Sequence, residues 1–466
     1  MTHSTTLAGM PARYWRSEAV ALIALAAPLS LAFLAQMAIT VTDVVMMGWL
    51  GPDDLAAGSL ASNYNALFFF FGTGLGTAVA PMIAHALGAR RLSEVRPITQ
   101  CGIILVLALS LPFGVGIWWG ADVLVLIGQD PENARRAEGY LRTVIWALPT
   151  AMIFVVLRNF VAAHSRPRSA LVVVVLAIGV NAVANYALMF GNWGAPRLEL
   201  AGAGLATSIA DAFMAFALLG YILTDRRFRR YHLWARITTI DPTIMREMLR
   251  IGVPIGFTIL AEMGLFMVTT FMAGLIDTMT LAAHAIAMQT AGVAFMIPFG
   301  LAQAASVRIG LAAGSGRHDD VRRAGWVALY LGFATSLTAA ILIWFGAPLI
   351  VDGFLDLEDA ATAPLVPIAL SFLAVIAFMQ IFDTTQAVAA GVLRGLKDTR
   401  VPMVYAVIGY WGIGLAASIL LGFGAGWGGV GIWIGTGIGL AVVSLLLIAR
   451  FRRMDLQRAA AAAPAI

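Results

Sequence analysis

Long apolar blocks alternate with short polar segments along the whole chain. The blocks lie at about 18–48, 55–87, 97–119, 138–163, 169–190, 201–224, 243–275, 282–312, 324–350, 363–393, 402–422 and 430–450. A helix needs about 20 mostly apolar residues to cross a bilayer. The pattern therefore predicts twelve transmembrane helices, and the blocks longer than about 25 residues predict tilted or bent spans.

The composition agrees with a chain that has lipid as its solvent. Of the 466 residues, 60% are hydrophobic and 12% are charged, against roughly 45–50% and 25% in soluble domains. A single soluble core stops growing near about 250–300 residues. Cys101 is the one cysteine, which excludes an internal disulfide and a cysteine metal cluster. We therefore expect an all-α integral membrane protein.

The basic residues collect on alternate segments of the chain, either between the apolar blocks or within their ends. All 30 lysines and arginines lie in one set of segments except Arg135, Arg136, Arg142 and Arg197, which lie in the other. The positive-inside rule assigns the basic set to the cytoplasm. We expect a multi-pass protein of the bacterial inner membrane with both termini cytoplasmic. Arginines scattered in this way, Arg158 included, are typical of membrane anchors and argue against nucleic acid as a partner.

The sequence also contains an internal repeat. One constant offset in residue number relates Pro28 to Pro254, Gly74 to Gly300, and Arg91 to Arg317. Further along, an offset longer by one position relates Val161 to Val388 and Gly202 to Gly429. Matched proline, glycine and arginine positions are harder to attribute to apolar bias than matched leucines. The chain is therefore interpreted as two copies of one unit.

Each copy contains six predicted helices, and this count sets the expected architecture. Residues 1–225 form the first bundle, residues 226–241 a cytoplasmic linker, and residues 242–466 the second bundle with a short basic tail. Because six is even, the copies are parallel and related by a pseudo-two-fold axis along the membrane normal. Such a pair of bundles suits alternating access around a central cavity.

Several short motifs, each weak alone, occur in a specific order along the whole chain. They are Ala27-Pro28-Leu29, Val41-Thr42-Asp43, Met47-Gly48, Leu55-Ala56-Ala57, Gly252-Val253-Pro254 followed by Glu262, and Phe382-Asp383 through Lys397-Asp398-Thr399. This ensemble resembles the multidrug and toxic compound extrusion (MATE) family, and the acids at Glu262 and Asp383 resemble its NorM-type branch. The resemblance implies export of hydrophobic or cationic drugs in exchange for sodium or protons. That branch leads us to expect a tyrosine one turn before Asp383, where Met379 stands.

Three acids in apolar surroundings are the candidates for cation coupling: Glu262, Asp383 and Asp43. A charged group near the bilayer centre costs a few kcal/mol, so such acids persist where they bind a cation or exchange a proton. Glu262 and Asp383 are also the candidate ligands for sodium. The alternative is a carboxyl group that is hydrogen-bonded between helices and has no part in transport.

Other polar residues inside the predicted spans are candidates for the lining of the pathway: Gln36, Asn181, Asn185, Gln289 and Gln380. Gln36 occupies the repeat position of Glu262, so the repeats differ in charge there, and we expect an ion site biased towards the second half. Hydrogen bonds between helices explain such residues equally well. For Asp211 we expect a packing or backbone-bonding role, and for His85 and His284 a role at a helix end or in packing.

The residues leave four classes of function to weigh. A secondary antiporter for organic cations fits the deep acids, whereas a flippase for a lipid-linked precursor predicts several basic residues in the central cavity. A membrane enzyme needs a nucleophile–base pair or a metal cluster, and the sequence offers neither. The repeat gives little support to the fourth class, a channel. We therefore expect a transporter without a cofactor that acts as a monomer among membrane lipids, with H⁺ or Na⁺ as coupling ion.

Overall fold

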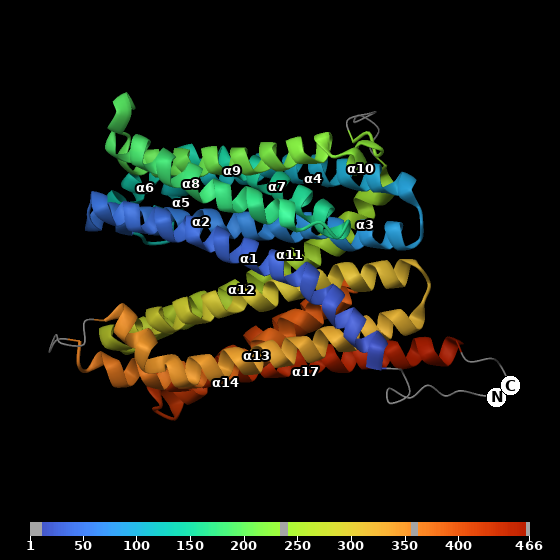
Figure 1. Ribbon diagram of the computed structural model, residues 1–466. Coiled ribbons are helices and arrows are strands. Elements are labelled where there is room, and N and C mark those ends of the chain that lie inside the picture. The colour runs from blue at the N-terminus through green and yellow to red at the C-terminus, as the bar shows by residue number, and fades with distance from the viewer. Residues whose placement is uncertain (1–11, 234–240, 356–361, 463–466) are drawn as a thin grey trace. The chain divides into compact units, whose positions relative to one another are not determined.

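The computed structural model describes residues 12–233, 241–355 and 362–462 of the chain. Within those ranges every regular element is a helix (Figure 1). Eleven helices in the described residues are long and apolar enough to cross a membrane, or up to 12 if the pair α6–α7, bent by 50°, is one span. The predicted all-helical membrane fold is confirmed.

The first half of the chain begins with the long helix α1. Its elements are α1 (Ala12–Leu50), α2 (Pro52–Thr77), α3 (Val79–Gly88), α4 (Leu92–Trp118), α5 (Gly120–Leu126), α6 (Pro131–Val144), α7 (Ala147–Ala163), α8 (Arg168–Phe190), η2 (Asn192–Gly194), α9 (Glu199–Thr224) and α10 (Arg226–Arg229). The Asp130 side chain caps α6 by accepting from the Asn133 N–H, and Pro131 supplies the first helical residue. Gly191, at φ 75°, ends α8 in the left-handed conformation that glycine favours.

The second half repeats the pattern of long helices. Its elements are α11 (Pro242–Ile276), α12 (Thr278–Gly314), α13 (His318–Phe354), α14 (Leu365–Gly395), α15 (Arg400–Val407), η3 (Ile408–Gly414), α16 (Leu415–Ile419), η4 (Leu420–Gly424) and α17 (Gly428–Ala462). The Asp277 carboxylate caps α12 through the Thr280 N–H, at 2.6 Å. The segments α15 to η4 together make one candidate span, and its π-helical turns η3 and η4 are the kind of irregularity that is frequent at functional sites.

Two compact units make up the described chain. One contains the residues up to Ser30 and those from Ala261 onwards, and the other is Leu31–Leu260. The change from one unit to the other thus falls inside α1 and α11, shortly after Pro28 and Pro254. The predicted division into 1–225, 226–241 and 242–466 follows the repeat instead, and it stays a prediction.

Two glycines mark places where α1 and α11 pack closely against another helix. In Leu31–Leu260, a Cβ on Gly74 of α2 would collide with the backbone of Gly256 in α11. In the other unit, a Cβ on Gly300 of α12 would lie 2.5 Å from the backbone nitrogen of Ser30 in α1. Ser30 and Gly256 are themselves related by the repeat, as are Gly74 and Gly300. The two crossings are therefore repeat equivalents, each made by the second span of one repeat and the first span of the other.

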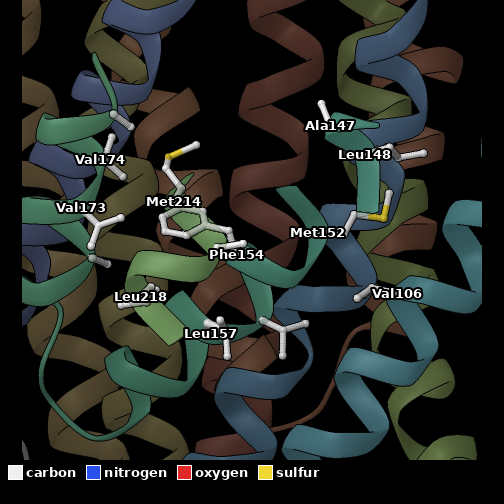
Figure 2. Close-up of a cluster of buried hydrophobic side chains, with 14 of the residues drawn as sticks. Val106, Ala147, Leu148, Met152, Phe154, Leu157, Val173, Val174, Met214 and Leu218 are labelled. Carbon is white, nitrogen blue, oxygen red and sulfur yellow. The ribbon is translucent and has the colours of Figure 1, made fainter. Parts of the chain in front are cut away.

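The apolar core of Leu31–Leu260 includes side chains from many of its helices, among them α4, α7, α8 and α9. Figure 2 shows side chains that these helices contribute to it, among them Val106, Phe154, Val174, Met214 and Leu218. All five are at most 3% exposed. Since these residues come from four different spans, their packing fixes the bundle against which α1 presents Gln36 and Asp43.

An ion pair fastens the start of α1 within its unit. Arg308 of α12 donates from Nε to Glu18 Oε1 at 2.8 Å and from Nη2 to Glu18 Oε2, and the side chains are 30% and 13% exposed. We expect Glu18→Gln to lower the free energy of unfolding by about 1.5–3 kcal/mol, because a hydrogen bond to a charged group contributes about that much. Thermal unfolding of the purified protein measures the change. The matched control is Glu94→Gln, which removes the exposed pair with Arg91 and should cost less than about 1 kcal/mol; equal losses in both variants would contradict the prediction.

Candidate cation-coupling site

Two carboxyl groups of different helices meet in the unit that contains the second half. Glu262 lies on α11, and Asp383 lies on α14 and is only 3% exposed. The two groups are close enough to interact electrostatically, and the Gln386 amide, one turn after Asp383, contacts Glu262. Two neighbouring carboxylates repel each other unless a proton or a cation lies between them. The pair is therefore suited to hold a cation.

A tyrosine from a third helix completes this cluster. The fully buried Tyr410 lies on η3, its hydroxyl accepts a hydrogen bond from Gln386 Nε2, and it interacts with both Glu262 and Asp383. Beside it, Trp411 Nε1 donates to the carbonyl of Ala261 at 3.0 Å. That bond joins η3 to the residue before Glu262. The π-helical turn and α11 thus hold each other where the carboxyl groups meet.

Three oxygens of α14 are buried without a hydrogen-bond donor among the described residues. They are Gln380 Oε1, Asp383 Oδ1 and Gln386 Oε1. The amide nitrogens of the two glutamines are engaged, Gln380 with Thr384 at 3.3 Å and Gln386 with Tyr410. Leaving such acceptors unpaired costs about 1–3 kcal/mol each. Oxygen atoms are also the ligands that hard cations such as sodium prefer. The helix therefore offers acceptors to a proton donor or a cation.

A second acidic cluster lies in Leu31–Leu260. The buried Asp43 of α1 accepts at Oδ1 from Asn181 Nδ2 at 2.9 Å and from Asn185 Nδ2 at 2.6 Å. Its Oδ2 accepts from Thr207 Oγ1 of α9 at 3.3 Å. Asp211, one turn further along α9, is close enough to interact with Asp43 electrostatically. Two carboxyl groups thus share this cluster as well, but here amides and a hydroxyl satisfy one of them.

This hydrogen bonding gives a prediction for stability. We expect Asp43→Leu to lower the free energy of unfolding by about 1.5–4.5 kcal/mol, because it leaves the buried Asn181 amide without an acceptor, at about 1–3 kcal/mol, and removes one hydrogen bond of Asn185, at about 0.5–1.5 kcal/mol. The Asn185 amide keeps its bond to Asn181 Oδ1 at 3.2 Å. Asp43→Asn keeps one acceptor oxygen and should cost clearly less. Chemical or thermal unfolding in detergent compares the two variants. Equal destabilisation would mean that the bonds to Asp43 do not support the fold.

Comparison with known proteins identifies the fold and the repeat. The MatE family matches residues 28–187 and 254–420. The chain belongs to the MatE family. The two matched stretches begin at Pro28 and Pro254, the prolines that open the repeat alignment of this MatE chain.

Curated relatives of this MatE chain cover nearly its full length. A probable multidrug resistance protein NorM of Mesorhizobium japonicum is 44% identical over 447 residues, 96% of each chain. A protein of the same description from Brucella suis is 40% identical over 95% of this chain and 94% of its own. This chain therefore resembles the NorM proteins from end to end.

Solved structures agree on the fold at lower identity. A eukaryotic MATE transporter, AtDTX14, has a TM-score of 0.84 at 22% identity, covering 95% of this chain and 98% of that chain. An outward-facing multidrug resistance MATE family transporter of the MOP superfamily has a TM-score of 0.85 at 19% identity, covering 95% and 96%. The helical architecture of the MatE chain is thus that of solved MATE transporters.

The structure also describes the other residues that were singled out in the sequence. Gln289 of α12 is half-buried and forms no hydrogen bond with any described residue. The buried His284 shares a hydrogen bond of 3.0 Å between its Nε2 and Thr270 Oγ1. His85 lies in the last turn of α3. Gln36 accepts from Arg158 Nη1 at 2.7 Å. The interpretation of Arg158 as a membrane anchor is wrong, because this side chain is only 3% exposed and contacts another helix of its unit.

Sequence reasoning missed four members of the two clusters: Gln386, Tyr410, Trp411 and Thr207. Gln386 lies one helical turn after Asp383, which is a signal that was available. Tyr410 is a polar aromatic residue inside an apolar block, but nothing in the local pattern assigns it to Asp383. The MatE chain has Met379 where a tyrosine was expected, and the hydroxyl near its acids comes from η3 instead.

Proposed function

We propose that this MatE chain is a secondary active antiporter that exports hydrophobic or cationic organic compounds in exchange for protons or sodium by alternating access. The observation that carries the proposal is the pair Glu262 and Asp383, together with the unpaired oxygens on α14. A carboxyl pair in a membrane-spanning bundle attracts a cation. An organic cation and the coupling ion then compete for negative charge, and competition of this kind couples their opposite movements.

Each acid has a definite role in this proposal. Glu262 and Asp383 bind the coupling ion, either as carboxylates that ligate sodium or as groups that exchange a proton. Asp43, held by Asn181 and Asn185, is a second coupling residue. Gln36, Gln289 and Gln380 line the pathway. The names of the NorM relatives support a multidrug substrate range.

We infer that the protein acts as a monomer in the bacterial inner membrane, with both termini in the cytoplasm. The distribution of basic residues over alternate segments supports this orientation. The bacterial sources of the NorM relatives support the location.

Ethidium transport into everted membrane vesicles tests the proposal. We expect the vesicles to take up the dye under a proton gradient alone or under a sodium gradient alone, and the gradient that drives uptake identifies the coupling ion. Vesicles without the protein are the control. Absence of uptake of any organic cation under either gradient would overturn the antiporter and would favour a flippase for a lipid-linked precursor.

A further inference from the structure

A buried arginine contacts the first span of the first repeat without an acidic partner. Arg158 of α7 donates from Nη1 to Gln36 Oε1 at 2.7 Å. Its guanidinium carbon lies 4.5 Å from the ring centre of Phe33 and 5.7 Å from that of Phe154. Within the part of the chain that the structure describes, no carboxylate pairs with it. A charge that is 3% exposed and lacks a counter-charge is costly, so this arrangement needs an explanation.

The repeat relates this contact to the carboxyl pair. Gln36 corresponds to Glu262 at the first offset of the repeat, and Arg158 corresponds to Thr385 at the second offset. Thr385 lies between Asp383 and Gln386. In both repeats the first and fourth spans therefore contact each other at equivalent positions along the helices. In the second repeat this meeting point carries Glu262 and Asp383. In the first repeat the counterparts of those acids are the neutral Gln36 and Val156, and Arg158, two residues after Val156, brings a fixed positive charge to Gln36.

We propose that Arg158 is a tethered cation that occupies the first repeat's counterpart of the coupling-ion site and so prevents a coupling ion from binding there. The inference rests on the proposed function, since it treats Glu262 and Asp383 as the ion site. The guanidinium supplies the positive charge that a bound ion supplies in the second repeat. Stacking on Phe33 and Phe154 holds that charge in place, since a cation over an aromatic face is attracted by the ring. Arg158 is thus a specificity-determining residue that confines ion binding at this level to one half.

The chemistry of arginine suits this role better than that of lysine. A guanidinium stays charged at any physiological pH and stacks flat on aromatic rings, whereas a buried ammonium readily loses its proton. A permanent charge is needed, because a residue that released its proton would leave the position open to the coupling ion. The inference therefore predicts that the first repeat becomes an ion site only when the arginine is removed and an acid is supplied.

Ion counting on the purified protein tests this with three variants. Gln36→Glu alone pairs the new carboxylate with Arg158 and should bind no further cation. Gln36→Glu combined with Arg158→Gln leaves that carboxylate without a counter-charge and should bind one additional cation per protein. Arg158→Gln alone adds no acid and should leave the count unchanged. The probes are radioactive sodium, and protons taken up from weakly buffered solution on acidification, with size-exclusion elution as the check that each variant is folded.

Two results would overturn the inference. One is an additional cation in Gln36→Glu with Arg158 intact, and the other is none in the folded double variant. If the double variant does not fold, Thr385→Arg decides: a guanidinium at the matching position of the second repeat should displace one cation from the parent protein, and an unchanged count would reject the idea. These counts need no transported substrate, so they remain readable if ethidium transport fails and the antiporter proposal falls.

Discussion

Glu262→Gln and Asp383→Asn are each expected to abolish ion-driven ethidium transport while the protein stays folded. Each variant removes one of two carboxyl groups that are close enough to interact electrostatically, and each replaces it with an amide of similar size. Losing a charged ligand removes about 1.5–3 kcal/mol, which weakens ion binding by roughly ten- to hundredfold. Initial rates of uptake into everted vesicles under the driving gradient measure the effect.

The variant that combines Glu262→Gln with Asp383→Asn gives a more specific prediction. Because Glu262 and Asp383 act on the same ion, their effects should not add, and the double variant should transport about as poorly as either single variant. Glu94→Gln is the matched control, since it makes the same change at an exposed residue paired with Arg91 and should transport like the parent. Unimpaired uptake in both single variants would remove the pair from the mechanism. Losses that multiply in the double variant would mean two independent sites.

The fold could be predicted from the sequence because hydropathy alone specifies spans. Each apolar block is long enough for a helix that satisfies its own backbone in lipid, and the described helices lie close to the predicted blocks. The fourth span is the exception, since it is divided at Val144 and Ala147 by a bend of 50°. Trp146 and the polar face of α6 lie at the bend. A hydropathy value averaged over a whole span does not reveal such local features.

The candidate acids could also be found from the sequence, but their partners could not. Placing a charged acid within an apolar block costs free energy in the membrane. Acids such as Asp43, Glu262 and Asp383 can therefore be picked out from the sequence. Which helix faces which acid depends on packing between spans. Tyr410, on η3, lies close to Asp383 and Glu262, and the bond from Trp411 to Ala261 joins η3 to α11. Thr207 reaches Asp43 in the same way, from α9 to α1.

Arg158 shows a limit of interpreting charge from its position in the sequence. It lies in the last third of α7 (Ala147–Ala163), so the sequence groups it with the basic end of that span. Its burial against Gln36, Phe33 and Phe154 depends on contacts with α1 as well as with its own helix, and α1 is distant in the chain. The repeat did contain a hint, since Gln36 stands where the second half has Glu262.

Gly300→Ala and Gly74→Ala are each expected to destabilise the protein by about 1–3 kcal/mol, the usual cost of overpacking a close contact. A Cβ on Gly300 would lie 2.5 Å from the backbone nitrogen of Ser30 and 2.7 Å from its Cα, and a Cβ on Gly74 would collide with the backbone of Gly256. Backbone cannot rotate away as a side chain can, so α1 or α11 must move as a whole. Thermal unfolding of the purified variants measures the loss.

Gly220→Ala is the control that separates crowding from helix propensity. Gly220 lies inside α9 with no atom within 4 Å of its Cβ position, so alanine there should be neutral or stabilising by up to about 1 kcal/mol. Glycine-to-alanine substitution is thus expected to destabilise the protein at the crowded positions and to leave it unchanged or stabilise it at the open one. If Gly300→Ala and Gly74→Ala unfold at the parent's temperature, the crossings are not tight. If only one of them is destabilised, the two crossings are not equivalent, and the repeat does not extend to the contacts that hold α1 and α11.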